Sequence, residues 1–127
     1  MDNDNKDVAI TIANEAGGEG DDGMMGVACV IANRARVKDK TPYEIVHEPK
    51  QFSCWDVLTP GMMEENYIAV KEIADKLAAE CLSLFDITEG ALNYLAEWLY
   101  ESPRCPEWAK GMIVTKKIGR HVFLKPA

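Results

Sequence analysis

The stretch Ala13-Asn14-Glu15-Ala16-Gly17-Gly18-Glu19-Gly20 places a carboxylate at the end of an apolar helical stripe, immediately before two glycines. Val8, Ile12 and Glu15 follow the spacing i, i+4, i+7, so we expect them to share one helix face. Burial and the negative end of the helix dipole both favour a carboxyl group that keeps its proton, as a general acid needs. On this fragment alone, a helix-terminal Glu turned to solvent before a glycine C-cap is the more common arrangement.

Local signals predict several helices around this stretch. The first helix is predicted over about residues 5–16, with Gly17-Gly18 as its end. Asp21 or Asp22 is expected to cap a second helix that reaches about Val37. The small residues of this second helix would let another helix approach closely; they are Gly23, Gly26, Ala28, Ala32 and Ala35. Thr41-Pro42-Tyr43-Glu44 combines proline in the first turn with a Thr-x-x-Glu capping box, which predicts a short third helix before Pro49.

The later part of the chain mixes helix and strand signals. One helix of about six turns is predicted from the periodic apolar residues Met63, Tyr67, Val70, Ala74, Leu77, Cys81 and Leu84. After Gly90 the pattern fits helix and strand equally well. The tail from Ile113 to Leu124 alternates in part around Gly119-Arg120, which predicts a small antiparallel hairpin. The fold class is therefore α+β, mostly helical, with one domain over residues 1–127.

Composition limits the function classes. The chain has 127 residues, 47% of them hydrophobic and 28% charged, which suits one soluble domain with a real core. The net charge of −7 argues against nonspecific nucleic-acid binding and gives no attraction to anionic wall polymers. We therefore expect recognition through a groove. No apolar run could span a membrane, and the first residues do not have the pattern of a signal peptide.

The four cysteines have no close pairing such as C-x-x-C. Cys29 and Cys81 lie within apolar helical patterns and are expected to be small core residues. A disulfide between Cys54 and Cys105 stays open as an alternative to free thiols. Metal binding is not expected, because zinc-ligand spacing is missing and the chain has only two histidines.

Further motifs follow Glu15 in a fixed order: residues 26–34 (GVACVIANR), 48–55 (EPKQFSCW), 90–94 (GALNY), 108–112 (WAKGM) and 118–123 (IGRHVF). In this order and spacing they resemble the cell wall hydrolase family that includes the spore cortex-lytic enzymes, from about Val8 to Phe123. The resemblance implies a lysozyme-like domain related to the soluble lytic transglycosylases and goose-type lysozymes. It implies cleavage of the peptidoglycan glycan strand between N-acetylmuramic acid and N-acetylglucosamine.

The resemblance also implies site residues. Glu15 matches the catalytic glutamate, and Gln51 and Ser53 match a polar segment that positions substrate. Turn chemistry is an equal explanation for those two residue types. Tyr94 matches a tyrosine near the acid, and packing in the core is its equal alternative. Asn93 stands where many relatives carry a histidine, so the pH profile should differ from theirs because Asn does not titrate.

Two tryptophans and two histidines complete the candidates. Trp55 and Trp108 could stack on sugar rings, although simple packing is the more frequent role of a lone Trp. His121 matches the family's tail motif, and a structural hydrogen bond is its expected role. His47 ends the predicted third helix and is given no function.

The reaction type depends on a second carboxylate. A hydrolytic muramidase needs one as nucleophile or base, and Glu19 and Asp56 are the candidates. Glu19 is expected to be exposed, beside the start of the second helix. A lytic transglycosylase needs only Glu15, because the C6 hydroxyl of muramic acid attacks the anomeric carbon and forms a 1,6-anhydro ring. We predict the transglycosylase, with the muramidase and a noncatalytic wall-binding module as alternatives.

The expected partner is the peptidoglycan glycan strand, with no metal or organic cofactor, no nucleic acid and no membrane. A monomer is expected. Without a signal peptide or a separate wall-binding domain, the sequence suits a phage endolysin that accumulates in the cytoplasm before release, or an excised catalytic domain of a wall-located protein.

Overall fold

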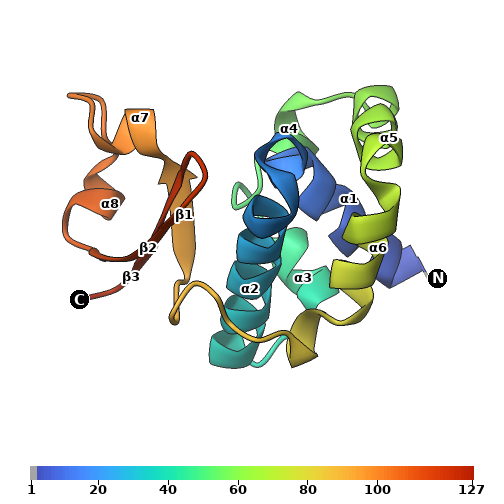
Figure 1. Ribbon diagram of the computed structural model, residues 1–127, viewed down its shortest axis with the longest axis horizontal. Coiled ribbons are helices and arrows are strands. Elements are labelled where there is room, and N and C mark those ends of the chain that lie inside the picture. The colour runs from blue at the N-terminus through green and yellow to red at the C-terminus, as the bar shows by residue number, and fades with distance from the viewer. Residues whose placement is uncertain (1–2) are drawn as a thin grey trace.

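The computed structural model describes residues 3–127, and these residues form a helical part and a sheet part (Figure 1). The helical part contains α1 (Asn3–Ala16), η1 (Gly17–Glu19), α2 (Gly20–Lys38), α3 (Pro42–Val46), α4 (Cys54–Val57), α5 (Pro60–Ala69), α6 (Lys71–Ala79) and η2 (Cys81–Ser83). The sheet part contains β1 (Asn93–Ala96), α7 (Glu97–Tyr100), α8 (Glu107–Lys110), β2 (Ile113–Ile118) and β3 (His121–Lys125). The α+β fold class is therefore confirmed.

The sheet is antiparallel, and β3 lies in its centre between β1 and β2. The predicted tail hairpin is the β2–β3 pair, which contains an irregularity between Val114 and Lys116. The ambiguous segment after Gly90 supplies β1, so the sheet has a third strand that the sequence did not resolve. Tyr94 of β1 lies opposite Phe123 of β3.

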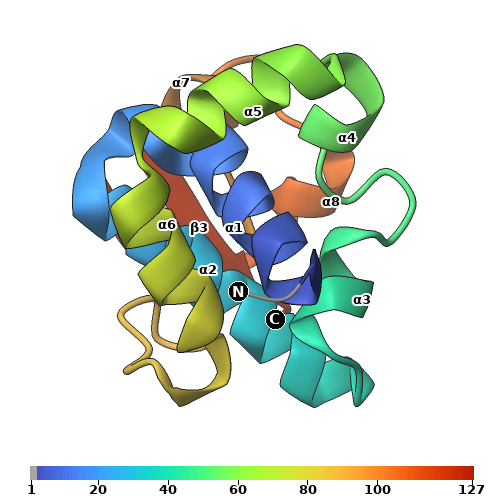
Figure 2. The same ribbon diagram turned by 90° about the vertical axis from the view of Figure 1, so that its right-hand side faces the viewer.

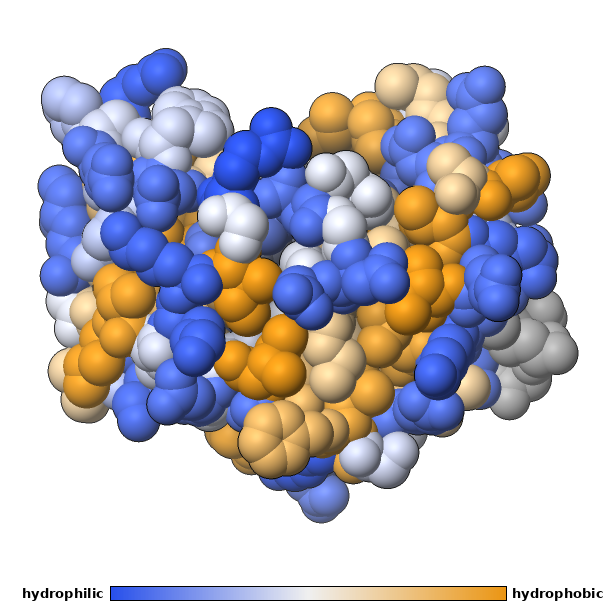
Figure 3. All heavy atoms as spheres, viewed as in Figure 1, coloured by the Kyte–Doolittle hydropathy of each residue, from blue (hydrophilic) through white to orange (hydrophobic). Residues whose placement is uncertain are grey.

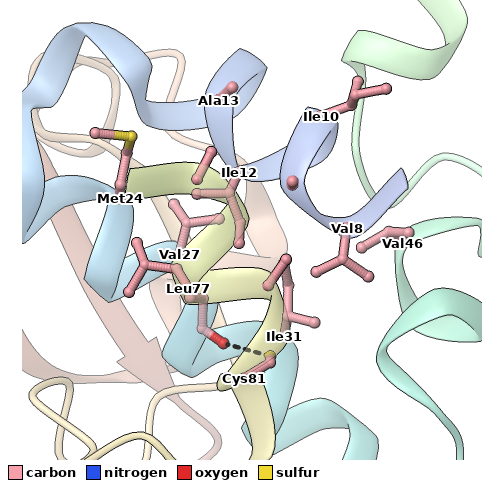
Figure 4. Close-up of a cluster of buried hydrophobic side chains, with 14 of the residues drawn as sticks. Val8, Ile10, Ile12, Ala13, Met24, Val27, Ile31, Val46, Leu77 and Cys81 are labelled. Atoms are coloured by element: carbon pink, nitrogen blue, oxygen red, sulfur yellow. Dashed lines mark hydrogen bonds between the residues drawn. The ribbon is translucent and has the colours of Figure 1, made fainter. Parts of the chain in front are cut away.

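Helix α1 forms the middle of the helical part, with α2, α5 and α6 around it (Figure 2). Its Val8 and Ile12 are almost completely buried, as the i, i+4 spacing predicts. Figure 4 shows these side chains meeting those of α2 and α6. The thiol of Cys81 closes this cluster by donating a hydrogen bond to the carbonyl of Ala28 at 3.4 Å.

The predicted six-turn helix is wrong, because the chain bends at Val70 (φ −130°, ψ 25°) between α5 and α6. A straight helix of that length would be about 33 Å long and would extend past α1, whose 14 residues span about 21 Å. The bend keeps both halves against α1, so the periodic residues Met63, Tyr67 and Leu77 are still buried.

The helix starts agree with the sequence in one case and differ in another. Thr41 and Glu44 form the predicted capping box, with hydrogen bonds of 3.1 and 3.0 Å between side chain and backbone. Asp21 and Asp22 are not the cap of α2, because Glu19 occupies that position. They lie in the first turn, where negative charge still favours the helix dipole.

The sheet packs on α2 at a glycine. A Cβ at Gly26 would lie 2.6 Å from the Cζ atom of Phe123, whose side chain is fully buried. At Gly26, therefore, α2 is approached by a side chain of strand β3, whereas the sequence predicts the approach of another helix. The two residues before β1 are also bonded to α2. Asn33 donates to the carbonyl of Ala91 at 2.9 Å, and Arg34 donates to the carbonyl of Leu92 at 2.6 Å.

All four cysteines are buried free thiols, so the alternative of a disulfide between Cys54 and Cys105 does not hold. These two residues lie in different clusters, one in the helical part and one under the sheet.

Figure 3 shows apolar side chains at the lower centre of its face, where the segment after α6 passes. None of the helices within residues 3–127 is long and apolar enough to cross a membrane.

Gly26→Ala should lower the free energy of unfolding by about 1–3 kcal/mol, because the added methyl group overpacks the contact with Phe123. Urea denaturation would measure the change. Gly111→Ala is the matched control, since a Cβ at Gly111 meets no atom within 4 Å and its φ is −96°. Equal stability of the two variants would contradict the proposed contact.

Candidate active site

Glu15 and Tyr94 meet where the helical part and the sheet part join. Glu15 lies in the last turn of α1, and the hydroxyl of Tyr94 on β1 donates a hydrogen bond to its Oε1 atom. The two residues are 79 positions apart in the chain. Burial, and then the charge of Glu15, raises the pKa of Tyr94 well above 10, so the hydroxyl keeps its proton and remains a donor.

Two hollows flank Glu15. The sheet-side hollow has a volume of about 440 Å³ and is lined by Glu15, Arg34, Lys50, Gln51, Ser53, Asn93, Tyr94, Trp108 and Met112. The helix-side hollow has a similar volume, about 440 Å³, and is lined by residues 13–19, Asn66, Ala69, Val70 and His121. Glu15 lines both hollows, so its carboxyl group lies at the boundary between them.

A third hollow of about 710 Å³ continues from the helix-side hollow. The two share Gly17, Ala69 and Val70. The three hollows are therefore neighbours in series, with Glu15 in the lining of the first two. A series of this kind fits a chain-like ligand better than a compact one.

Most of the substrate-binding residues expected from the sequence come together here. Gln51, Ser53, Asn93 and Trp108 all line the sheet-side hollow with Glu15 and Tyr94. Trp108 leaves 48% of its surface exposed, so its ring is available to a ligand. With Arg34, five segments that are distant in sequence therefore contribute to one hollow.

Trp55 is the exception. Its indole N–H donates to the hydroxyl of Thr11 at 3.0 Å, and its ring packs 4.6 Å from that of His47. It lines neither hollow, so packing, the alternative role, describes it better than sugar stacking. Asp56 is exposed on α4 and also lines neither hollow.

Glu19 is not exposed, and that prediction is wrong. Only 10% of its side chain is accessible, because Arg120 covers it. The carboxylate accepts hydrogen bonds from the Arg120 backbone N–H (2.9 Å), Nε (2.9 Å) and Nη2 (2.6 Å). These bonds hold the pKa of Glu19 below its ordinary value of 4.5, so Glu19 is ionised at neutral pH and is a poor proton donor.

Arg34 lines the sheet-side hollow and was not singled out from the sequence. Its residue surface is only 8% exposed, and its guanidinium lies 5.2 Å from the ring centre of Phe52. The signal was present, because Val27, Ile31 and Arg34 repeat the i, i+4, i+7 spacing that drew attention to Glu15. This spacing predicts that Arg34, like Glu15, lies at the end of a buried stripe.

His121 and Cys54 also lie near the acid. His121 lines the helix-side hollow, and its ring is 5.2 Å from that of Tyr94. The expected structural hydrogen bond is missing at its Nδ1 atom, which is buried without a partner among the described residues. Burial lowers the pKa of His121, and burial followed by the charge of Glu15 raises that of the Cys54 thiol to about 12.

The site presents one carboxyl group with a hydroxyl donor beside it. Within residues 3–127, no three His, Cys, Asp or Glu side chains gather closely enough to hold a metal ion. A carboxyl group held by Tyr94 at the boundary of two hollows can protonate an atom of a ligand that lies across both.

Comparisons with known proteins identify the family of this chain. The family model described as Cell Wall Hydrolase matches residues 18–124. The spore cortex-lytic enzyme of Bacillus cereus is 28% identical over 131 residues, which cover 97% of this chain. The chain spans 44% of the length of that relative.

Solved structures are similar over nearly the whole chain. The catalytic domain of the germination-specific lytic transglycosylase SleB from Bacillus anthracis has a TM-score of 0.75 and 27% identity, with 98% of this chain and 96% of that chain covered. The catalytic domain of the Bacillus cereus SleB protein has a TM-score of 0.74 and 28% identity, covering 97% and 90% respectively.

The lowered pKa of Glu19 predicts a dependence of stability on pH. Because the folded pKa lies below 4.5, the ion pair with Arg120 stabilises the protein above that pH and is lost as the pH falls through the folded value. Glu19→Gln should therefore be less stable than wild type at neutral pH, and the difference should shrink below pH 4.5. Denaturation at a series of pH values would measure it; Glu65→Gln on α5 is the control.

Proposed function

The chain belongs to the cell wall hydrolase family, and on this basis we propose that it cleaves the glycan strand of peptidoglycan as a lytic transglycosylase. The observation that carries the proposal is the position of Glu15, at the boundary of two hollows and hydrogen-bonded by Tyr94. The lytic transglycosylase whose catalytic domain is similar over nearly the whole chain supports the same reaction.

In the proposed reaction, a glycan strand lies across Glu15 with the scissile bond at the carboxyl group. Protonated Glu15 donates its proton to the glycosidic oxygen, and the bond from that oxygen to the anomeric carbon of N-acetylmuramic acid breaks. The C6 hydroxyl of the same sugar then forms a bond to the anomeric carbon. Its proton passes to the Glu15 carboxylate, which restores the acid and leaves a 1,6-anhydro end.

This reaction needs one carboxyl group. Among the described residues, Glu15 is the only carboxylate that lines the sheet-side hollow. In the helix-side hollow, the carboxylate of Glu19 is occupied by Arg120. A hydrolytic muramidase would require Glu19 to leave this ion pair or Asp56 to reach the hollows from the exposed side of α4.

We assign Tyr94 the role of orienting Glu15, since its raised pKa keeps a proton on the donating oxygen. Gln51, Ser53, Asn93 and Trp108 are proposed to bind the sugar rings in the sheet-side hollow. No cofactor takes part. We further propose that residues 1–127 act as one monomeric catalytic domain at the cell wall. The site combines residues of the helical part with residues of the sheet part, so the two parts act together.

Product analysis separates the possible reactions. Purified peptidoglycan digested by the protein should yield fragments with 1,6-anhydromuramic ends, which mass spectrometry distinguishes from hydrolysed ends by the mass of one water. Asp56→Asn should keep substantial activity. Hydrolysed ends, with activity lost in Asp56→Asn, would support the muramidase; no release of fragments would support a noncatalytic wall-binding module.

Glu15→Gln should reduce the rate of fragment release by ~10²–10⁴ while the variant stays folded, because the amide cannot donate the proton. Turbidity of a peptidoglycan suspension would follow the rate, and circular dichroism would check the fold. Glu19→Gln, measured at a temperature where it is folded, should lose much less activity. A folded Glu15→Gln that retains more than about a tenth of the rate would remove Glu15 from this role.

Tyr94→Phe should lower turnover by roughly 10- to 150-fold, because a hydrogen bond to a charged group contributes about 1.5–3 kcal/mol. Its melting temperature should change little, since the ring still packs against Phe123. Normal turnover with a clearly lower melting temperature would mean that the hydroxyl group is structural.

A further inference from the structure

Arg34 is a buried cation that pairs with no carboxylate among the residues that the structure describes. Its residue surface is 8% exposed, yet the ion pairs of the described residues do not include it. The two glutamates whose charges act on Arg34 have other partners: Glu48 pairs with Lys38 and Lys40, and Glu15 accepts from Tyr94. Burying a charge is costly unless it is paired, so this arrangement calls for an explanation.

The hydrogen bonds of Arg34 leave part of its guanidinium free. Nε donates a short bond of 2.6 Å to the carbonyl of Leu92, which fixes the group in place. Nη1 and Nη2 reach only the neutral oxygens of Gln51 at 3.5 Å and Asn93 at 3.3 Å, longer than typical N–H···O bonds. A guanidinium carries five N–H donors, so these three contacts do not use all of them.

Arg34 lines the sheet-side hollow, and it also lines a smaller hollow of about 150 Å³ beside Lys38 and Leu92. Lys50 lines the sheet-side hollow as well, so two cations accompany the single carboxylate of Glu15 there. This local excess of positive charge stands in a chain whose net charge is −7. Burial lowers the pKa of Arg34, although the charges of Tyr94, Glu48 and Glu15 act in the opposite direction.

We propose that Arg34 binds a carboxylate of the substrate in the sheet-side hollow. A guanidinium held at Nε can present its two Nη groups to the two oxygens of a carboxylate, a geometry that a lysine cannot reproduce. Gln51 and Asn93, which contact the same Nη groups, would then keep the guanidinium plane oriented toward the ligand.

The inference rests on the proposed function for the source of the carboxylate. N-acetylmuramic acid differs from N-acetylglucosamine by a lactyl ether, which ends in a carboxylate or continues into a peptide that carries carboxylates of its own. Both sources offer the same chemistry. Arg34 would thus distinguish the muramic sugar from its neighbour and place it on the sheet side of Glu15.

Binding of single sugars tests this without any cleavage. The probes are N-acetylmuramic acid, with the lactyl carboxylate; N-acetylmuramoyl-L-alanine, with a carboxylate one residue further; the methyl ester of N-acetylmuramic acid; and N-acetylglucosamine. Dissociation constants would come from NMR titration of the wild-type protein. At least one carboxylate probe should bind about ten- to a hundredfold more tightly than the ester and N-acetylglucosamine.

Variants assign the preference to Arg34. Arg34→Gln should remove it, and Arg34→Lys should keep only part of it. Arg36→Gln is the matched control, because Arg36 is an exposed arginine on the same helix that lies outside the hollow. Lys50→Gln should reduce the preference less than Arg34→Gln does.

Three results would overturn the proposal: equal binding of all four probes to the wild type, retention of the preference in a folded Arg34→Gln, or its loss in Lys50→Gln alone. The wild-type comparison of acid and ester applies even if Arg34→Gln does not fold. The test is also independent of catalysis. A protein that prefers the carboxylate probes but releases no anhydro fragments would contradict the proposed function and leave this inference standing.

Discussion

The close approach of Phe123 to Gly26 is the contact on which the rest of the structure depends. Helix α2 lies between α1 and the sheet, and β3 reaches it only because Gly26 has no side chain. Once β3 is seated there, its partner β1 brings Tyr94 to Glu15. The same contact places the turn between β2 and β3. Arg120 lies in this turn and covers Glu19. A glycine in a helix therefore costs some helix stability and makes the site possible.

Three charged side chains that line the two hollows beside Glu15 show how the surroundings of a group determine its chemistry. Glu15 and Glu19 are four residues apart, yet one accepts from a neutral phenol and the other from a guanidinium. The first is the residue proposed to exchange a proton with a ligand, whereas the second is held ionised. Arg34 has the opposite charge, and its acceptors among the described residues are neutral, so it is suited to an anionic ligand.

The sequence predicts those features that depend on local spacing. The first helix, its glycine end, the capping box of Thr41 and the buried stripe leading to Glu15 all depend on residues within one or two turns. The break at Val70 could not be predicted in this way, because the apolar period continues through it and only the length of α1 limits the helix.

The candidate site also contains features that the sequence predicts and features that it does not. Gln51, Asn93, Tyr94 and Trp108 were identified through their resemblance to a family and do line one hollow. The burial of Glu19 was missed because Arg120, which covers it, is 101 residues away. Trp55, a candidate for sugar stacking, and Asp56, a candidate second carboxylate, lie on the short helix α4 and line neither hollow beside Glu15.

The order of the strands has a consequence for the synthesis of the protein. Tyr94 is held in β1, and β1 pairs only with β3, which is formed by residues 121–125. A growing chain carries Glu15 early, but the strand that seats Tyr94 exists only after residue 125 has been made and has left the ribosome. Until then the carboxyl group has no phenol beside it. The nascent protein is thus kept from assembling its Glu15–Tyr94 pair by the order in which its residues are joined.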